Sequence, residues 1–208
     1  MDVLILAAGT SSRMGKTNKL LPPVGDTCMV TNTCMQAISF LETQKDPCRL
    51  VVVTGYRHAS ILKALQPCID RLGRTQGPVS MVVVQNTNYR DGQFSSTKTG
   101  LLEIQDNVPF FIQLSDLPLI QSKHYAALAG LLGTHKAVRP FYHENPGHPV
   151  LFAPEMKHII LGYDNTFSVG KILKGMDVLA AQMDDPAYIT DVDTPSDLPV
   201  LTSQPPLL

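Results

Sequence analysis

The sequence lacks features that mark several whole classes of protein. Its formal net charge is −1 over 208 residues, which argues against a surface for nucleic acids or anionic membranes. No apolar run approaches the roughly 18 residues of a membrane-spanning helix. The four cysteines include no Cys-x-x-Cys pair, so we expect buried or inert thiols in a cytoplasmic protein rather than a redox or metal site.

What the sequence does contain is typical of one globular domain. Hydrophobic residues make up 44% and charged residues 17%, an ordinary balance for a chain with a sizeable core. The first ten residues, MDVLILAAGT, have no basic segment ahead of the apolar stretch, which favours a first strand over an export signal. We expect a single domain over residues 1–200 and a C-terminal tail over 201–208.

Short apolar runs alternate with segments of helical periodicity. Strands are predicted at 3–6, 49–55, 80–86, 109–116, 137–142 and 148–153. Helices are predicted at 28–42, 61–72, 125–132, 154–162 and 168–174, with a further helix beginning near Ser95. This alternation predicts an α/β fold, a Rossmann-like three-layer sandwich around a mostly parallel sheet.

Four loops that follow predicted strand ends carry unusual polar residues. They are 7–19, 85–96, 115–118 and 190–194. Because ligands of parallel α/β sheets bind at the carboxyl ends of the strands, we expect these loops to converge on one cleft.

The first of these loops, LAAGTSSRMGKTNK at 6–19, is suited to a nucleotide triphosphate. Gly9 follows two alanines directly after a strand, so backbone amides can approach a phosphate closely. Arg13 adds a planar guanidinium and Lys19 a compact charge, and both suit phosphate oxygens.

A P-loop is the obvious alternative, because Gly15-Lys16-Thr17 looks like its last three residues. A P-loop has four residues between its two glycines, a length that wraps the backbone around the β-phosphate. Here Thr10 to Met14 makes five. The spacing therefore disfavours a P-loop NTPase or kinase.

The longer string LAAGTSSRMGKTNKLL resembles the signature of the MobA-like nucleotidyltransferases, in the form of the molybdenum cofactor cytidylyltransferase branch. The likeness extends to VVVTGYRHASI at 51–61 and to QNTNYRDGQFSSTKTGL at 85–101, where Thr87 replaces a usual proline. It implies a fold of the nucleotide-diphospho-sugar transferase type, with Arg13 and Lys19 as catalytic residues beside the α-phosphate. The nucleotide-binding residues that it implies are Leu6, Ala7, Ala8, Gly9, Arg13, Lys19, Thr54, Gly55, Asn86, Ser95 and Ser96.

Two acidic segments supply candidate metal ligands. Asp116 in QLSDLPLI follows a strand, and a carboxylate beside a triphosphate is a natural ligand of Mg²⁺. The segment also resembles the family's metal-binding D-x-P. TDVDTPSDL at 190–198 resembles the family's C-terminal motif, and its alternating Asp191 and Asp193 point to opposite faces if the segment is extended. Which of the two meets the metal stays open.

The resemblance also implies a pocket for the second substrate. NPGHPVLF at 145–152 is similar to the family strand that lines it, so Gly147, His148 and Pro149, with Pro118, are the predicted acceptor-binding residues. One departure stands out. Many relatives carry an arginine near 161–175, whereas this chain has none after Arg139, which leaves Lys171 and Lys174 as candidate replacements.

The implied reaction is a Mg²⁺-dependent transfer of CMP from CTP to the terminal phosphate of molybdenum-molybdopterin, with release of pyrophosphate. Its partners are these two small molecules, with a possible transient contact to a molybdoenzyme or its chaperone. Two alternatives remain: transfer from GTP or another NTP to a different phosphorylated acceptor, and a non-catalytic nucleotide- or pterin-binding chaperone, since fold alone does not determine activity.

Overall fold

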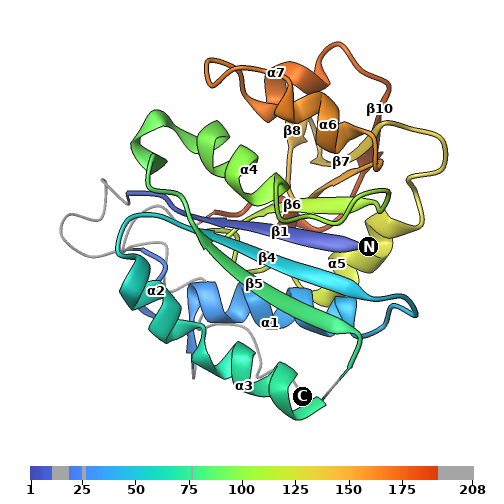
Figure 1. The fold of residues 1–208 in the computed structure, drawn as a ribbon. Helices are drawn as coiled ribbons and strands as arrows, with labels where there is room; N and C mark the ends of the chain where they lie inside the picture. Colours follow the sequence, from blue (N-terminus) through green and yellow to red (C-terminus); the bar gives the residue numbers. More distant parts are fainter. Residues whose placement is uncertain (11–18, 25–26, 76, 192–208) are drawn as a thin grey trace.

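The computed structural model describes residues 1–10, 19–24, 27–75 and 77–191. Its centre is an eight-stranded sheet of order β10-β7-β9-β6-β1-β4-β5, in which β8 pairs with β7 (Figure 1). The strands are β1 Asp2–Ala7, β4 Cys48–Thr54, β5 Val79–Gln85, β6 Phe110–Leu114, β7 Ala137–Tyr142, β8 Asn145–Pro146, β9 Val150–Phe152 and β10 Val178–Gln182. A separate hairpin joins β2 Pro23–Val24 to β3 Thr27–Cys28.

The sheet is mostly parallel, as the sequence predicts. β1 pairs in parallel with β4 on one side and with β6 on the other. Only the short β8 and β9 run antiparallel to their named neighbours, and β9 lies between β6 and β7. β1 is buried along its whole length, which explains its continuous apolar run, because a central parallel strand is covered on both faces.

Helices cover both faces of the sheet. They are α1 Met29–Leu41, α2 His58–Ala64, α3 Gln66–Thr75, α4 Gln93–Leu101, α5 Ser122–Ala129, α6 Met156–Leu161 and α7 Val169–Leu173, with short 3₁₀ turns η2 Tyr89–Asp91 and η3 Pro186–Tyr188. Figure 1 places α1, α2, α3 and α5 on one face and α4, α6 and α7 on the other.

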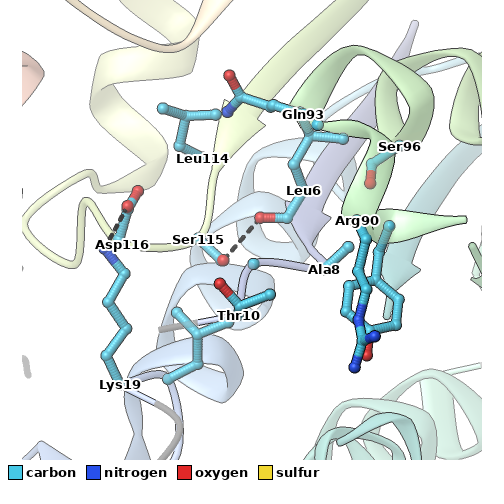
Figure 2. Close-up of a pocket in the computed structure, with 14 residues that line it drawn as sticks. Leu6, Ala8, Thr10, Lys19, Arg90, Gln93, Ser96, Leu114, Ser115 and Asp116 are labelled. Carbon is cyan, nitrogen blue, oxygen red and sulfur yellow. Dashed lines mark hydrogen bonds and ion pairs between the residues drawn. The ribbon is translucent and has the colours of Figure 1, made fainter. Parts of the chain in front are cut away.

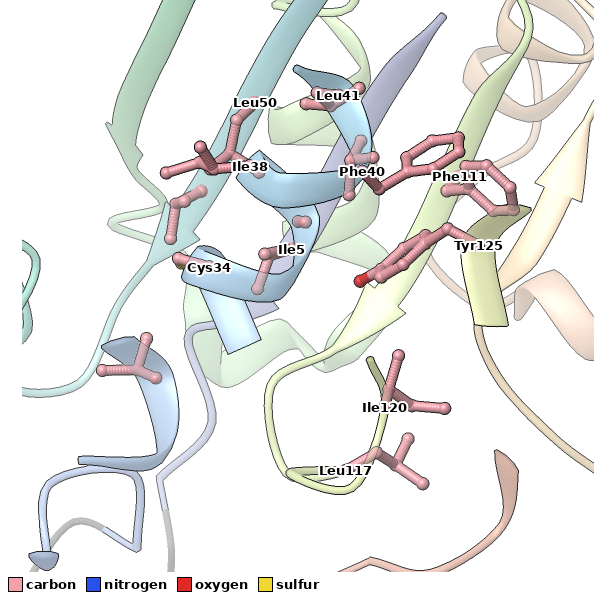
Figure 3. Close-up of a cluster of buried hydrophobic side chains, with 14 of the residues drawn as sticks. Ile5, Cys34, Ile38, Phe40, Leu41, Leu50, Phe111, Leu117, Ile120 and Tyr125 are labelled. Atoms are coloured by element: carbon pink, nitrogen blue, oxygen red, sulfur yellow. The ribbon is translucent and has the colours of Figure 1, made fainter. Parts of the chain in front are cut away.

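Each face has its own hydrophobic cluster. On the α1 face Phe40 stacks on Tyr125 with ring centroids 5.4 Å apart, and both meet Phe111 edge-on (Figure 3). On the α4 face, Phe94 and Leu101 pack with residues of β1, β6, α6 and α7. Side chains of β1 alternate between these clusters, so the parity of a residue decides which face it serves.

The secondary structure differs from the sequence predictions in two respects: one predicted helix is divided, and some short strands were not predicted. The predicted helix 61–72 is two helices, α2 and α3, with a break at Leu65. Pro67 lies in the first turn of α3, where its missing N–H costs nothing, but it could not continue α2. Strand β10 and the hairpin β2–β3 were not predicted, because they are short and carry no clear alternation.

The expected tail 201–208 lies outside the described residues. In the described ranges, no helix combines the length and the apolar character that crossing a membrane requires.

Candidate active site

A cavity of about 380 Å³ opens where β1 and β6 end beside the N-terminus of α4 (Figure 2). We call it the first cavity. Its described lining residues are Leu6, Ala8, Gly9, Thr10, Lys19, Leu20, Tyr89, Arg90, Gly92, Gln93, Ser96, Leu114, Ser115 and Asp116. Three of the four predicted loops therefore meet here, at the carboxyl edge of a parallel sheet.

Apolar or small residues at the end of β1 form one wall of the first cavity. Leu6 and Ala8 face the α4 side and line the cavity, and Gly9 follows them. A methyl group added at Gly9 would meet no atom of the described residues within 4 Å. The cavity can therefore receive a ligand close to this backbone. The side chain of Ala7 belongs to the cluster on the α1 face and does not line this cavity, so its predicted nucleotide contact would come from its backbone.

Lys19 and Asp116 meet across the cavity although 97 residues separate them. Lys19 Nζ donates to Asp116 Oδ2 at 2.7 Å (Figure 2). The other carboxylate oxygen, Oδ1, is buried and has no hydrogen-bond partner among the described residues. Ser115 Oγ donates to Leu6 O at 2.7 Å, which ties the end of β6 to the end of β1. Among the described residues the site thus holds two cationic side chains, Lys19 and Arg90, and one carboxylate, whose Oδ1 has no hydrogen-bond partner.

Asn86 organises the turn before α4. Its Nδ2 donates to Ser95 Oγ at 2.9 Å and to Ser96 Oγ at 3.0 Å, while its Oδ1 accepts the N–H of Asn88. Of these predicted nucleotide-binding residues only Ser96 lines the cavity. Ser95 Oγ donates to Asn88 O and Gly92 O. Asn86 and Ser95 therefore hold the loop in shape behind Ser96.

Thr54 and Gly55 also lie behind the cavity wall rather than on it. Thr54 is buried, with its Oγ1 bonded to His58 Nδ1 at 2.7 Å and to Val84 O at 3.2 Å. A methyl group at Gly55 would lie 2.7 Å from Tyr89 Cβ and 2.9 Å from Ala8 Cβ. Gly55 is thus the glycine that lets Tyr89 approach Ala8.

A second cavity, of about 200 Å³, continues from the first and shares Leu6, Gln93 and Leu114 with it. Its other described lining residues are Thr97, Ile112, Arg139, His148, Val150, Ser168, Val169, Gly170 and Leu173. The predicted acceptor residue His148 is therefore next to the first cavity, on the side of β9 and α7.

His148 is a neutral group in this setting. Burial lowers its pKa to about 4, and the positive charge of Arg139 acts in the same direction, against a bond to Ile112 O and the charge of Asp116. Its Nδ1 lies 3.4 Å from Ile112 O. At neutral pH the side chain can exchange hydrogen bonds but carries no charge.

The other predicted acceptor residues do not line either cavity in the described ranges. Gly147 packs on η3, since a methyl group there would lie 2.5 Å from Tyr188 O. Pro149 is buried after a cis peptide bond. Pro118 is buried and accepts a hydrogen bond from Asn32 Nδ2 at 3.0 Å on the α1 side. These three residues shape the strand ends that present His148 and Asp116.

The remaining predicted residues are only partly described. Arg13 and Asp193 lie outside the described residues. Asp191 is exposed after η3 and is not among the residues lining the two cavities. In the described ranges, no group of three or more His, Cys, Asp or Glu side chains is placed to hold a metal.

Sequence reasoning missed several lining residues. Arg90 and Gln93 lie within 85–96, one of the four loops that the sequence predicts to converge, so their polar side chains could have marked them as lining residues. Arg90 stands over the ring of Tyr89, 5.9 Å from its centroid. Arg139 lies on β7, outside the sequence motifs, and its position gave no sign that it lines a cavity.

The chain is similar to known nucleotidyltransferases in sequence and in fold. The chain is 25% identical over 197 residues, 95% of its length and 93% of the relative's, to the molybdenum cofactor cytidylyltransferase of Escherichia coli K12. A nucleotidyl transferase from Methanothermobacter thermautotroptrophicus superposes with a TM-score of 0.75 at 16% identity, over 96% of this chain and 94% of that one. The Mycobacterium tuberculosis protein Rv0371c, solved in complex with manganese, gives 0.68 at 19% identity over 96% of each chain.

The match to a family covers nearly the whole described fold. It extends over residues 3–195, and so includes both cavities and every strand of the main sheet. The chain belongs to the family of the MobA-like NTP transferase domain and is a nucleotidyltransferase.

Proposed function

We propose that this enzyme transfers CMP from CTP to the terminal phosphate of molybdenum-molybdopterin, with Mg²⁺, and releases pyrophosphate. The single observation that carries the proposal is the continuity of the two cavities, because a transferase of this kind must hold a nucleotide and an acceptor side by side. The choice of CTP and of a molybdenum-bearing acceptor is supported by the E. coli relative of that name.

In the proposed reaction an acceptor phosphate oxygen attacks the α-phosphorus of CTP. A new P–O bond forms as the bond to the bridging α–β oxygen breaks, and pyrophosphate carries away the electron pair. The acceptor oxygen is already anionic near neutral pH, so the reaction needs no strong general base. The protein supplies positioning and charge compensation.

The described residues provide both. The backbone after β1 and the Ser96 hydroxyl surround the nucleotide cavity, and Lys19 brings a positive charge to it. Arg13 is proposed to act with Lys19 on the α-phosphate. The second cavity, with neutral His148, receives the acceptor.

The residues present fit a divalent cation. Asp116 Oδ1 is buried without a hydrogen-bond donor among the described residues, which suits it to a metal. Mg²⁺ takes one or two carboxylates and completes its shell with phosphate oxygens and water, so a three-residue cluster is not needed. Asp191 or Asp193 is the proposed second ligand. When bound, the metal would neutralise phosphate charge and orient the triphosphate.

The test is a screen of the four NTPs with purified protein and Mg²⁺, with and without molybdenum-molybdopterin, reading pyrophosphate and orthophosphate separately. We expect acceptor-dependent pyrophosphate with CTP. Orthophosphate would indicate an NTPase, and binding without either product would indicate the chaperone alternative. Pyrophosphate only with another NTP or acceptor would keep the enzyme class and overturn the proposed substrates.

Base choice provides a sharper prediction. Ala8 is 5% exposed and its methyl group borders the first cavity. A methyl group in a pocket is worth about 1–3 kcal/mol, or roughly 10–200-fold in discrimination. We expect CTP to be preferred over GTP by about that factor and Ala8→Gly to reduce the preference without raising the CTP rate. The measurement is kcat/KM for both nucleotides in both proteins, and an unchanged ratio would remove Ala8 from base selection.

A further inference from the structure

The second cavity combines an apolar patch of the sheet with polar side chains around it. Strand pairing sets Leu6 beside Leu114 and Ile112 beside Val150, and all four line the cavity from the sheet. Gln93 and Thr97 of α4 form one wall, and α7 contributes the opposite wall. In this lining Arg139 is the only cationic side chain among the described residues.

Arg139 is an unusual residue for such a place. Its Nε is buried and has no hydrogen-bond partner among the described residues. A methyl group built on Gly170 would lie 3.9 Å from its Nη1, so the guanidinium lies against the glycine of α7. Burial lowers the pKa of Arg139, in accord with a charge held away from water.

Two other arginines show what a structural guanidinium looks like in this fold. Arg49 Nη1 donates to Glu103 O, and Arg71 is bound to Glu42 and Ser39. Arg139 is half-buried, and its buried Nε lacks such a partner among the described residues, so the desolvation of this part of the guanidinium is not offset. A ligand anion in the second cavity would offset that cost.

We propose that Arg139 binds the terminal phosphate monoester of the acceptor and holds it beside the nucleotide cavity. The inference rests on the proposed function, which brings two anions into adjoining cavities. The second anion needs its own counter-charge, since Lys19 is engaged with Asp116 in the first cavity. A guanidinium is suited to the task because its planar donors match two phosphate oxygens at once.

The experiment compares Arg139→Met, Arg139→Lys and, as a matched control, Arg71→Met, which removes an arginine from α3. Steady-state kinetics with molybdenum-molybdopterin and CTP give the constants for each substrate. We expect Arg139→Met to raise the acceptor KM at least about tenfold while the dissociation constant of CTP changes less than about twofold. Arg139→Lys keeps the positive charge but lacks the planar donors of the guanidinium, so its acceptor KM should lie between those of the wild type and Arg139→Met. Arg71→Met should match the wild type.

A second measurement does not depend on turnover. Inorganic phosphate is titrated calorimetrically into protein already saturated with CTP, so that the nucleotide cavity is filled. We expect phosphate binding in the wild type and its loss in Arg139→Met. Binding that depends on Arg139 in a protein that transfers nothing would uphold the anion site and reject the proposed function. Transfer with acceptor KM and phosphate binding unchanged by Arg139→Met would reject the anion site and uphold the function.

Thermal melting guards against a purely structural effect. Because Arg139→Met removes a half-buried guanidinium that has no hydrogen-bond partner among the described residues, its melting temperature should equal or exceed that of the wild type. A fall of more than about 5 °C, which corresponds to more than about 1 kcal/mol in a domain of this size, would show that the guanidinium is needed by the fold and would overturn the inference.

Discussion

The two cavities are neighbours, but they are built in different ways. The first is made largely from segments that are continuous in the sequence: the end of β1 with the residues after it, and the loop between β5 and α4. The second is assembled from single residues of β6, β7, β9, α4 and α7. The first combines small side chains and backbone with the charged Lys19, Arg90 and Asp116, and the second is lined by an arginine and a neutral histidine.

This difference shows which kind of binding site can be recognised from a sequence alone. A site made of backbone and small residues must use a continuous string, because consecutive peptide groups surround one ligand. A site made of separated side chains needs only one correct residue in each element. The first therefore appears as a motif, and the second becomes visible once the strands are paired.

The largest effect is expected from the removal of Lys19 from the first cavity. Lys19→Ala should lower the transfer rate at least about a thousandfold, because it removes a positive charge aimed at the reacting phosphate. Lys16→Ala should be mild. Turnover of both variants under one set of conditions separates a phosphate-binding Lys19 from a P-loop, in which Lys16→Ala would be the more damaging change. An inactive Lys16→Ala together with an active Lys19→Ala would contradict the role proposed for Lys19.

The next effect concerns Asp116, the carboxylate of the first cavity. Asp116→Asn should leave folding and metal-free CTP binding nearly intact and lower turnover at least about a hundredfold, since a metal ligand supplies several kcal/mol of charge stabilisation. Asp70→Asn on α3 is the control, because that exposed carboxylate bonds only to Gln66 in the described structure. More than about a third of the wild-type rate at saturating Mg²⁺ would remove Asp116 from the metal site.

A pair of glycines separates binding from packing in the first cavity. Gly55→Ala should destabilise the fold by about 1–3 kcal/mol, because its methyl group would overlap Tyr89 and Ala8. Gly9→Ala has open space and should leave the melting temperature unchanged. Its methyl group would occupy the cavity and weaken CTP binding about tenfold. Melting curves and calorimetry measure the two effects, and equal melting temperatures for the variants would contradict the packing assignment of Gly55.

The smallest expected effect is a pH dependence of the free energy of unfolding that comes from His148 in the second cavity. The pKa of His148 in the folded protein, about 4, lies below the ordinary histidine value of 6.5, so the unfolded chain binds more protons between these two pH values. The free energy of unfolding should therefore fall as the pH drops through this window, with His148 contributing at most about 3 kcal/mol. His148→Gln should flatten that slope, whereas exposed His158→Gln should not. Identical slopes for all three proteins would mean that His148 is not buried as a neutral group.

Much of the fold was predictable because its determinants are local. The apolar runs of β1, β4 and β5 predict strands, and Asp116 follows another such run, so its place at the carboxyl edge could be inferred. The break between α2 and α3 was missed although Pro67 was visible, because hydrophobic spacing continued through it. The short β10 was missed because it lacks a clear burial pattern.

By itself, the sequence determined the alternation of strands and helices, the phosphate-type loop after β1 and the carboxylate after β6. Only the tertiary structure decided that Ala7 faces the core, that Gly55 serves Tyr89, that Lys19 meets Asp116, and that Arg139 lies against Gly170. The physical reason is distance along the chain. Periodicity and turn chemistry act over a few residues, whereas these contacts depend on the order in which the strands pair and on which face each side chain then occupies.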